Sequence, residues 1–291
     1  MSDSITPVIG IIGGSGLYDV AGLADKEWRR IETPWGDASD DLLFGTLDGV
    51  RCVFLPRHGR SHRLSPTHLN YRANIDALKR SGVTDVLSLS AVGSLKAELP
   101  PGHFVIVDQF IDRSFAREKS FFGDGCVAHV SVADPVCPRI GDAVEAQALA
   151  LGIPTTRGGT YLVMEGPQFS TRAESHLYRS WGCSVIGMTN MPEAKLAREA
   201  ELPYASVAMV TDYDCWRESE EAVSAEMVMG NVARNIDTVR KSLLALIPTI
   251  PQQGDALCAN ALSTAIQTSP EAISPEAAAH LGIIFERYAK R

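Results

Sequence analysis

Short runs of hydrophobic residues alternate along almost the whole chain with longer stretches in which hydrophobic and polar residues mix. The short β-branched or apolar runs predict strands at residues 8–12, 51–55, 85–89, 104–107, 160–164, 184–188 and 204–210. The mixed stretches predict helices at residues 67–81 and 139–151, after Ser170 or Thr171, from Pro192, and over about two dozen residues from near Glu220. Because strands and helices alternate, we expect an α/β fold in which a mixed central sheet is flanked by helices on both sides.

The composition fits an ordinary globular protein. The chain has 291 residues, 45% of them hydrophobic, which is enough for one large α/β domain. Pro248, Pro251 and Gly254 mark a break in the chain, and two weaker helices are predicted after it. The N-terminus has no signal-peptide pattern, and no run of 18 uncharged apolar residues occurs. The six cysteines form no Cys-x-x-Cys pair, so we expect reduced thiols in a cytoplasmic protein.

A cluster of basic residues lies within this acidic chain. The net charge is −8, yet no acidic residue occurs between Asp48 and Asp76, where five arginines fall: Arg51, Arg57, Arg60, Arg63 and Arg72. Gly59 and Pro66 exclude one unbroken helix, so these side chains are expected on a loop after a strand. Such a loop suits a small anion, whereas the acidic chain disfavours a polynucleotide. Solvated arginines without a ligand are the alternative.

Other polar residues stand where predicted strands end. They are Ser15 in a glycine-rich turn, Ser90, Met188 with Thr189, and the pair Asp212 and Asp214. The glycine turn does not satisfy the Gly-x-Gly-x-x-Gly dinucleotide pattern, because Asp19 occupies the third glycine position. Ligands of α/β proteins bind at the carboxyl ends of strands, so we expect these residues to converge on one site. The long segment 109–138 is expected to be a functional loop or an assembly surface.

Five motifs in order now identify a family resemblance. Residues 9–17, 56–62, 165–174, 188–193 and 211–216 together resemble the methylthioadenosine-cleaving branch of the purine nucleoside phosphorylase family. The resemblance implies a phosphorylase/hydrolase-like single domain at residues 8–247, with a C-terminal helical extension at 248–291. It also implies a pentosyltransferase of purine and methionine salvage, in which inorganic phosphate is a co-substrate and displaces the purine from C1′ of the nucleoside. No cofactor, metal, nucleic acid or membrane is implied, and the family assembles as trimers or dimers of trimers.

The resemblance assigns roles residue by residue. Phosphate binding is implied for Ser15, Arg57, His58, Ser90, Ala91 and Thr189. Contact with the ribose is implied for Met188, contact with the base for Asp212 and Asp214, and lining of the nucleoside pocket for His62, Phe169 and Ile186. The 5′-methylthio group would be surrounded by Ala225, Val228 and Met229, with His129 reaching in from a neighbouring subunit. His129 as a plain surface histidine is the alternative.

The residues themselves agree with a phosphorolytic reaction. Asp212 and Asp214 lie two apart, so they share one face of a strand end. Two close carboxyl groups disfavour double ionisation, and we therefore expect one raised pKa and one acid able to protonate the departing purine. We give Asp212 the purine N7 and Asp214 the 6-amino group. The resemblance places Ser170 where relatives that use 6-oxopurines carry Glu, which favours a 6-aminopurine.

Several alternatives remain at this stage. Within the family, the protein could be a 6-oxopurine nucleoside or methylthioinosine phosphorylase. Ala225 stands where the family often has Val and could admit adenosine or longer 5′-thioethers. Outside the family, His58, His62 and His68 could form a metallohydrolase site, although no carboxylate near them completes it. A nucleotide-binding module without catalysis is the last alternative, and the aspartate pair counts against it.

Overall fold

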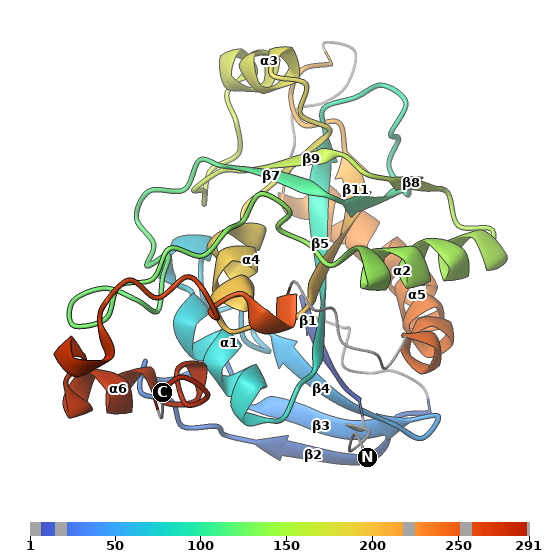
Figure 1. Ribbon diagram of the computed structural model, residues 1–291. Helices are drawn as coiled ribbons and strands as arrows, with labels where there is room; N and C mark the ends of the chain where they lie inside the picture. Colours follow the sequence, from blue (N-terminus) through green and yellow to red (C-terminus); the bar gives the residue numbers. More distant parts are fainter. Residues whose placement is uncertain (1–6, 15–21, 218–224, 251–257, 290–291) are drawn as a thin grey trace.

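The computed structural model describes residues 7–14, 22–217, 225–250 and 258–289 (Figure 1). Eleven strands in these ranges form one sheet: β1 Val8–Gly13, β2 Ala24–Arg29, β3 Leu42–Leu47, β4 Val50–Pro56, β5 Asp85–Ser94, β6 Phe104–Val107, β7 Gln109–Asp112, β8 Thr155–Arg157, β9 Thr160–Val163, β10 Val185–Gly187 and β11 Tyr204–Asp212. The α-helices are α1 Tyr71–Arg80, α2 Pro138–Ala150, α3 Arg172–Ser180, α4 Asn190–Glu199, α5 Ala225–Leu246 and α6 Pro275–Leu281. The predicted α/β fold with a mixed, helix-flanked sheet is confirmed.

The centre of the sheet is parallel, one margin is an antiparallel meander, and the strands at the other margin pair in parallel, β10 with β9, β9 with β7 and β6 with β8. β4, β1, β5 and β11 run in one direction, while β2 and β3 extend β4 as an antiparallel meander. β5 is the branch point: its first half lies between β1 and β11, and its last residues pair antiparallel with β10. The carboxyl ends of β1, β4, β5 and β11 therefore face one region.

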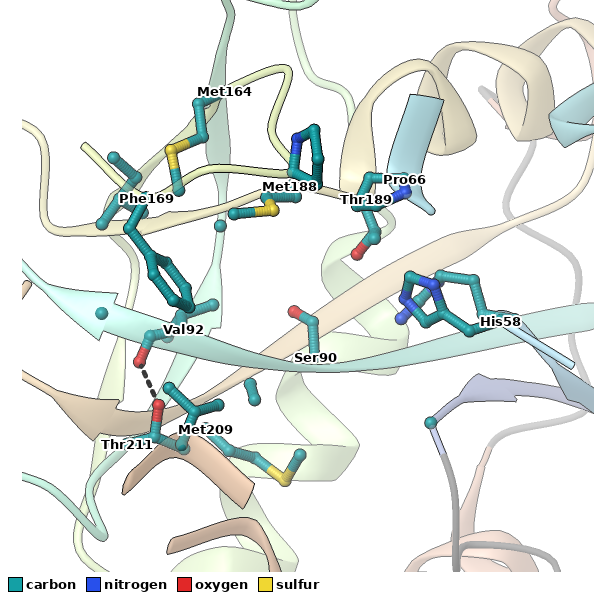
Figure 2. Close-up of a pocket in the computed structure, with 18 of the residues that line it drawn as sticks. His58, Pro66, Ser90, Val92, Met164, Phe169, Met188, Thr189, Met209 and Thr211 are labelled. Atoms are coloured by element: carbon teal, nitrogen blue, oxygen red, sulfur yellow. Dashed lines mark hydrogen bonds between the residues drawn. The ribbon is translucent and has the colours of Figure 1, made fainter. Parts of the chain in front are cut away.

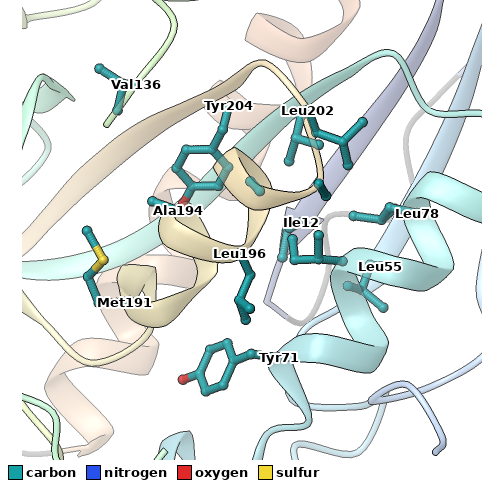
Figure 3. Packing of buried hydrophobic residues seen from close by; sticks show 14 of the residues in the cluster. Ile12, Leu55, Tyr71, Leu78, Val136, Met191, Ala194, Leu196, Leu202 and Tyr204 are labelled. Carbon is teal, nitrogen blue, oxygen red and sulfur yellow. The ribbon is translucent and has the colours of Figure 1, made fainter. Parts of the chain in front are cut away.

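Helices cover both faces of this sheet (Figure 1). α1 and α4 pack on one face, where Ile75, Leu78 and Leu196 are fully buried together with Ile12 from β1 (Figure 3). α2 and α5 pack on the other face through a second cluster, which includes Leu243. Each buried aliphatic side chain contributes about 1.5–3 kcal/mol through its removal from water, so the two layers hold the strand ends rigidly.

The C-terminal segment packs against the face that carries α1. Leu281, Phe285 and Tyr288 are buried in the same core cluster as the α1 side chains. The Tyr288 hydroxyl donates to Glu201 Oε1 at 2.6 Å, and the same oxygen accepts from the backbone N–H of Leu262 at 3.0 Å. Residues 258–289 are therefore joined to the main core by apolar contacts and by buried hydrogen bonds.

Two predicted boundaries were wrong for identifiable reasons. The strand predicted at 85–89 runs on to Ser94, because β11 pairs with it through Gly93, so Ser90 and Ala91 lie inside a strand. The helix predicted at 67–81 begins only at Tyr71, where the Asn70 side chain accepts from the Ala73 N–H and caps it. The predicted cap at residue 171 is confirmed as a capping box with Glu174.

Some strands gave no recognisable sequence signal. β2 is exposed at all six positions, so it lacks the alternation of apolar and polar residues that marks a strand. β7 lies inside the segment that we predicted as a long loop, and residues 113–137 are the irregular part of it. Among the described residues, no helix has the length and apolar character needed to span a bilayer.

Candidate functional site

A cavity of about 720 Å³ opens at the carboxyl ends of the central strands (Figure 2). His58, Ser90 and Thr189 surround one end of it and Phe169 stands at the other, with Met188 between them (Figure 2). Of the predicted site residues, the cavity is lined by Arg57, His58, His62, Ser90, Ala91, Phe169, Ile186, Met188, Thr189, Asp212, Asp214 and Val228. These residues include members of four of the five motifs, and Gly14 of the motif at residues 9–17 lines the cavity as well.

The remaining predicted residues are either outside the described part of the chain or described without being part of this lining. Ser15 lies outside the described residues, and Ala225 and Met229 lie on α5 with side chains that are likewise outside the description. Ser170 contacts a lining residue, since its hydroxyl lies 3.6 Å from the Met164 sulfur. His129 is exposed and does not line the cavity; its backbone N–H donates to Ala265 O at 2.9 Å.

Arg57 provides a buried cation at the phosphate end. It follows β4, and only 2% of its surface is exposed. Its Nε donates to Glu193 Oε2 at 2.8 Å, Nη2 contacts Glu193 Oε1 and Ser88 Oγ, and Nη1 donates to Leu89 O at 3.0 Å. A guanidinium has five N–H groups, so among the described residues one N–H of Nη1 is left for a ligand.

His58 is held as a neutral imidazole. Its Nδ1 donates to the Leu64 carbonyl at 2.9 Å, because that carbonyl can only accept, and its ring stacks on His62 with centroids 4.4 Å apart. The pKa of His58 is lowered to about 4; burial is the largest cause, Arg57 and His62 act in the same direction, and the Leu64 carbonyl and Glu193 oppose them. The ring therefore presents Nε2 as a hydrogen-bond acceptor near neutral pH. His62 adopts φ +51, a left-handed backbone typical of strained functional positions.

A buried polar network connects the hydroxyls below the cavity. Ser90 donates to Asn190 Oδ1 at 3.0 Å, and the Asn190 amide donates to the hydroxyls of Tyr204 and Ser206 at 2.6 and 2.8 Å. Thr189 immediately precedes Asn190 and lines the cavity. The hydroxyls of Ser90 and Thr189 are therefore positioned by packed, hydrogen-bonded neighbours.

The acidic end is built on the last residues of β11. Asp212 accepts the backbone N–H of Asp214 at 2.8 Å and the Thr211 hydroxyl at 2.7 Å. Asp214 adopts φ +52. The pKa of Asp214 is raised, and burial is the largest cause. We expected one raised pKa from repulsion between the two carboxylates; the raised pKa is present, but desolvation is its main source.

Gly93 allows the two carboxylates to lie against β5. A Cβ atom at this position would stand 2.8 Å from Asp212 Oδ1 and 3.1 Å from the Ile186 Cγ2. Only glycine leaves that space free. We did not assign a role to Gly93 from the sequence, although it directly follows the predicted Ser90 segment.

Nothing in the sequence indicated a role for Arg117, which the structure places behind the cavity. It lies in the segment between β7 and α2, buried, and makes six contacts. Nε donates to Glu165 Oε1 at 3.1 Å; Nη1 contacts Tyr71 OH, Met188 O and Met191 O; and Nη2 contacts Met164 O and Glu165 O. Glu165 also accepts from Thr67 and from two backbone N–H groups of the same segment, which lower its pKa to about 2 against the opposing effect of burial. Arg117 therefore fixes the backbone of cavity residues Met164 and Met188.

Metal ligation was also examined at this end of the cavity. No group of three His, Cys, Asp or Glu side chains suitable for a metal ion occurs among the described residues. His58 and His62 stack on one another, and His68 instead contacts the Ser65 hydroxyl at 2.7 Å. The geometry thus assigns these histidines other contacts.

The fold is that of an α/β protein whose cavity has a buried cation, Arg57, and a pair of buried acids, Asp212 and Asp214, among its lining. The family model of the phosphorylase superfamily matches residues 8–248, and the chain belongs to that superfamily. The family resemblance inferred from the five motifs is therefore confirmed.

The most similar curated relatives share nearly their whole length with this chain. It is 57% identical over 284 residues to the S-methyl-5′-thioadenosine phosphorylase of Rhodospirillum rubrum, with 97% of each chain covered. It is 56% identical over 286 residues to the protein of that name from Cereibacter sphaeroides, with 97% of this chain and 99% of the relative covered.

Two solved structures are similar to this chain over most of its length. A methylthioadenosine phosphorylase from an Antarctic soil metagenomic library has a TM-score of 0.91 at 47% identity, with 96% of this chain and 99% of that chain covered. A mutant adenosine/methylthioadenosine phosphorylase from Schistosoma mansoni, in complex with adenine, has a TM-score of 0.84 at 35% identity, with coverage of 90% and 99%.

Proposed function

We propose that this enzyme catalyses the reversible phosphorolysis of S-methyl-5′-thioadenosine to adenine and 5-methylthioribose 1-phosphate. The observation that carries the proposal is the single cavity of about 720 Å³ with Arg57 and His58 at one end and Asp212 and Asp214 among its lining. That volume lies within the range of small-molecule sites. The high identity to S-methyl-5′-thioadenosine phosphorylases over almost the full chain supports the same reaction.

The phosphate end supplies positioning with little added charge. The remaining N–H of Arg57, the Thr189 hydroxyl and the backbone at Ala91 are the donors that would meet a bound phosphate, and the Ser90 oxygen, whose proton is donated to Asn190 Oδ1, lines the same cavity. Held donors convert the attack into an oriented step within one complex. As the glycosidic bond breaks, the ribose becomes oxocarbenium-like, and the negative charge of the bound phosphate stabilises it.

The base end supplies the proton. The leaving purine gathers negative charge, and protonation of the ring removes it. Asp214 has a raised pKa and so retains a proton to higher pH than an exposed aspartate, while Asp212 accepts two internal hydrogen bonds. The pair thus offers one acid and one acceptor to the same base. The assignment made from the sequence, N7 to Asp212 and the 6-amino group to Asp214, stays a prediction. The raised pKa of Asp214 instead favours Asp214 as the acid, and comparison of Asp214→Asn with Asp212→Asn distinguishes the two.

A 6-aminopurine is the base that these residues suit. Two carboxyl groups can accept from a 6-amino donor. Ser170 stands where the family resemblance places a glutamate in relatives that use 6-oxopurines. It lies near Asp214, because the Cys215 thiol contacts both the Ser170 backbone carbonyl at 3.2 Å and Asp214 Oδ2 at 4.0 Å. The adenine-bound S. mansoni relatives also support this choice over methylthioinosine.

The assembly and compartment are part of the proposal. We propose a homotrimer or dimer of trimers, in which His129 of one subunit approaches the site of the next. The exposed Phe115, with 81% of its surface accessible on the segment after β7, supports an assembly role for that segment. The six cysteines are all free thiols, which supports a reducing, cytoplasmic setting.

The test is chromatography of the products formed from methylthioadenosine, methylthioinosine or adenosine, each with and without phosphate. We expect adenine from methylthioadenosine only when phosphate is present. Release without phosphate would make the enzyme a nucleosidase and refute the phosphate role of Arg57 and His58. Hypoxanthine from methylthioinosine alone would instead refute the roles given to Ser170, Asp212 and Asp214.

A further inference from the structure

We propose that Glu193 is a positioning residue that neutralises Arg57, so that the bound phosphate keeps the negative charge with which it stabilises the ribosyl cation. This inference rests on the proposed function, because it concerns the phosphate end of the same cavity. No role for Glu193 follows from the motif in which it occurs, and it does not line the cavity itself.

Glu193 is committed entirely to groups below the phosphate end. Only 2% of its surface is exposed. Its carboxylate receives two contacts from Arg57, at 2.8 Å to Oε2 and 3.2 Å to Oε1. Oε1 also accepts from the Ser88 hydroxyl at 2.6 Å and from the Tyr204 hydroxyl at 2.8 Å. These four contacts hold the buried carboxylate in place against the guanidinium.

The buried charges at the phosphate end then sum to nearly zero, while Arg63, which also lines the cavity, is exposed to solvent and donates from Nη2 to Ser39 O at 2.8 Å. Arg57 contributes one positive charge and Glu193 one negative charge at contact distance. His58 is neutral, because its Nδ1–H is given to Leu64 and burial keeps its pKa near 4. His62, stacked on His58, is the other titratable ring at this end. Phosphate therefore meets hydrogen-bond donors and one guanidinium N–H, with little net positive charge.

Compensation of this kind affects catalysis more than binding. An uncompensated guanidinium would hold the phosphate dianion more tightly before the reaction and would withdraw electron density from it. Tighter ground-state binding without an equal gain in the transition state raises the barrier. The ion pair also fixes the direction of the remaining Nη1 N–H of Arg57, since the other four N–H groups are occupied.

The same hydrogen-bond network also reaches Ser90, another side chain at the phosphate end of the cavity. Asn190, three residues before Glu193 on α4, donates to Tyr204 OH and contacts Ser88 Oγ at 3.3 Å, and it accepts from Ser90. Tyr204 and Ser88 are thus shared between Glu193 and Asn190. One helix, α4, thereby positions both Arg57 and Ser90 from below.

The decisive variant is Glu193→Gln, which removes the charge and keeps the size. Its dissociation constant for inorganic phosphate alone is measured by equilibrium dialysis, and kcat and both KM values are measured with methylthioadenosine. We expect phosphate to bind about tenfold more tightly, because a buried like charge is removed. We expect kcat to fall about tenfold or more, with the KM for the nucleoside little changed.

Glu199→Gln is the matched control. Glu199 lies on the same helix, is buried, and contacts only Ser120 and the Phe121 N–H. This variant should leave the phosphate dissociation constant and kcat within twofold of wild type. Glu193→Asp retains the charge and should keep the phosphate dissociation constant within about threefold, even if its thermal stability falls; it decides the matter if Glu193→Gln does not fold.

Three results would overturn the inference. They are weaker phosphate binding in Glu193→Gln, an unchanged kcat in that variant, or a tenfold loss of phosphate affinity in Glu193→Asp. The last result would mean that Glu193 only holds Arg57 in place and that its charge has no role. Failure of the proposed function is seen separately, as absence of phosphate-dependent adenine release by the wild-type enzyme. The dialysis measurement needs no nucleoside and is therefore independent of that outcome.

Discussion

Arg117→Lys tests whether one buried arginine holds the nucleoside end of the cavity together. Arg117 makes six contacts, to the Glu165 carboxylate, the Tyr71 hydroxyl and four backbone carbonyls, and two of those carbonyls belong to cavity residues Met164 and Met188. Lysine keeps the positive charge but has only three N–H donors. At least three of the six contacts are therefore lost.

The expected loss of stability follows from those contacts. A net contribution of about 1 kcal/mol for each hydrogen bond predicts about 3 kcal/mol of destabilisation for Arg117→Lys. That is a large share of the roughly 5–15 kcal/mol that stabilises a typical native domain. Because the carbonyls of Met164 and Met188 lose their donor, we also expect the KM for the nucleoside to rise more than the KM for phosphate.

Arg113→Lys on the same segment is the matched control. Arg113 is exposed, and its guanidinium lies 6.0 Å from the Trp181 ring centroid, so its substitution should change stability by no more than about 0.5 kcal/mol. Urea unfolding and steady-state kinetics of both variants decide the matter. If Arg117→Lys is as stable as Arg113→Lys and its two KM values change in parallel, the assigned positioning role is wrong.

Three further predictions concern titratable groups. Asp214→Asn should lower kcat about 10²–10⁴-fold. It should also abolish the fall in kcat at rising pH, because burial raises the pKa of Asp214 and the acid loses its proton above that pKa. Asp212→Asn is assayed beside it, and a wild-type pH–rate profile in Asp214→Asn would contradict the role of Asp214 as the acid. Binding of inorganic sulfate near neutral pH should take up no protons at His58, because its pKa of about 4 leaves the ring neutral and its Nδ1–H is already donated to Leu64 O. Calorimetry in buffers of different ionisation enthalpy measures this. The buffer dependence of the binding heat should be the same in wild type and in His58→Asn, and a dependence that is lost in this variant would disprove the prediction. Burial raises the pKa of Glu199 from 4.5 to about 7, so the contribution of Glu199 to stability is present below pH 4.5 and is lost as the pH rises through 7. At pH 8, Glu199→Gln should therefore be more stable than wild type by on the order of 3 kcal/mol. Equal midpoints of urea unfolding for the two proteins would refute this.

The sequence predicted the residues that face the ligand better than the residues behind them. Arg57, Ser90 and Asp212 stand at strand ends or in polar segments, where side-chain type and position both indicate ligand contact. Glu193 and Arg117 gave no comparable signal. A charged residue in a helix or a long loop is usually exposed, and only tertiary packing shows that each is buried against a partner far away in sequence, 136 residues away for Glu193 and Arg57.

The dependence on tertiary packing also explains which strands were predicted from the sequence and which were not. Central strands such as β11 were predicted well because burial on both faces requires a continuous apolar run. The marginal strand β2 was missed because all its side chains are exposed and its pairing with β3 comes from the backbone. The length of β5 was misjudged because polar residues such as Ser90 and Ser94 are buried there by neighbouring strands and hydrogen-bonded partners.

β5 and β11 together set the separation between the two ends of the cavity. Ser90 lies at the phosphate end and Gly93 under the acids, three residues further along β5, which corresponds to about 10 Å at the usual rise of a strand. The register of β11 against β5 shifts between Val210 and Asp212, so that Asp212 pairs with Gly93. Such an irregularity re-aims a side chain at a strand end. One strand pair therefore carries both the Ser90 hydroxyl and the space that the acids occupy, and the distance between the two ends of the cavity is set by the sheet.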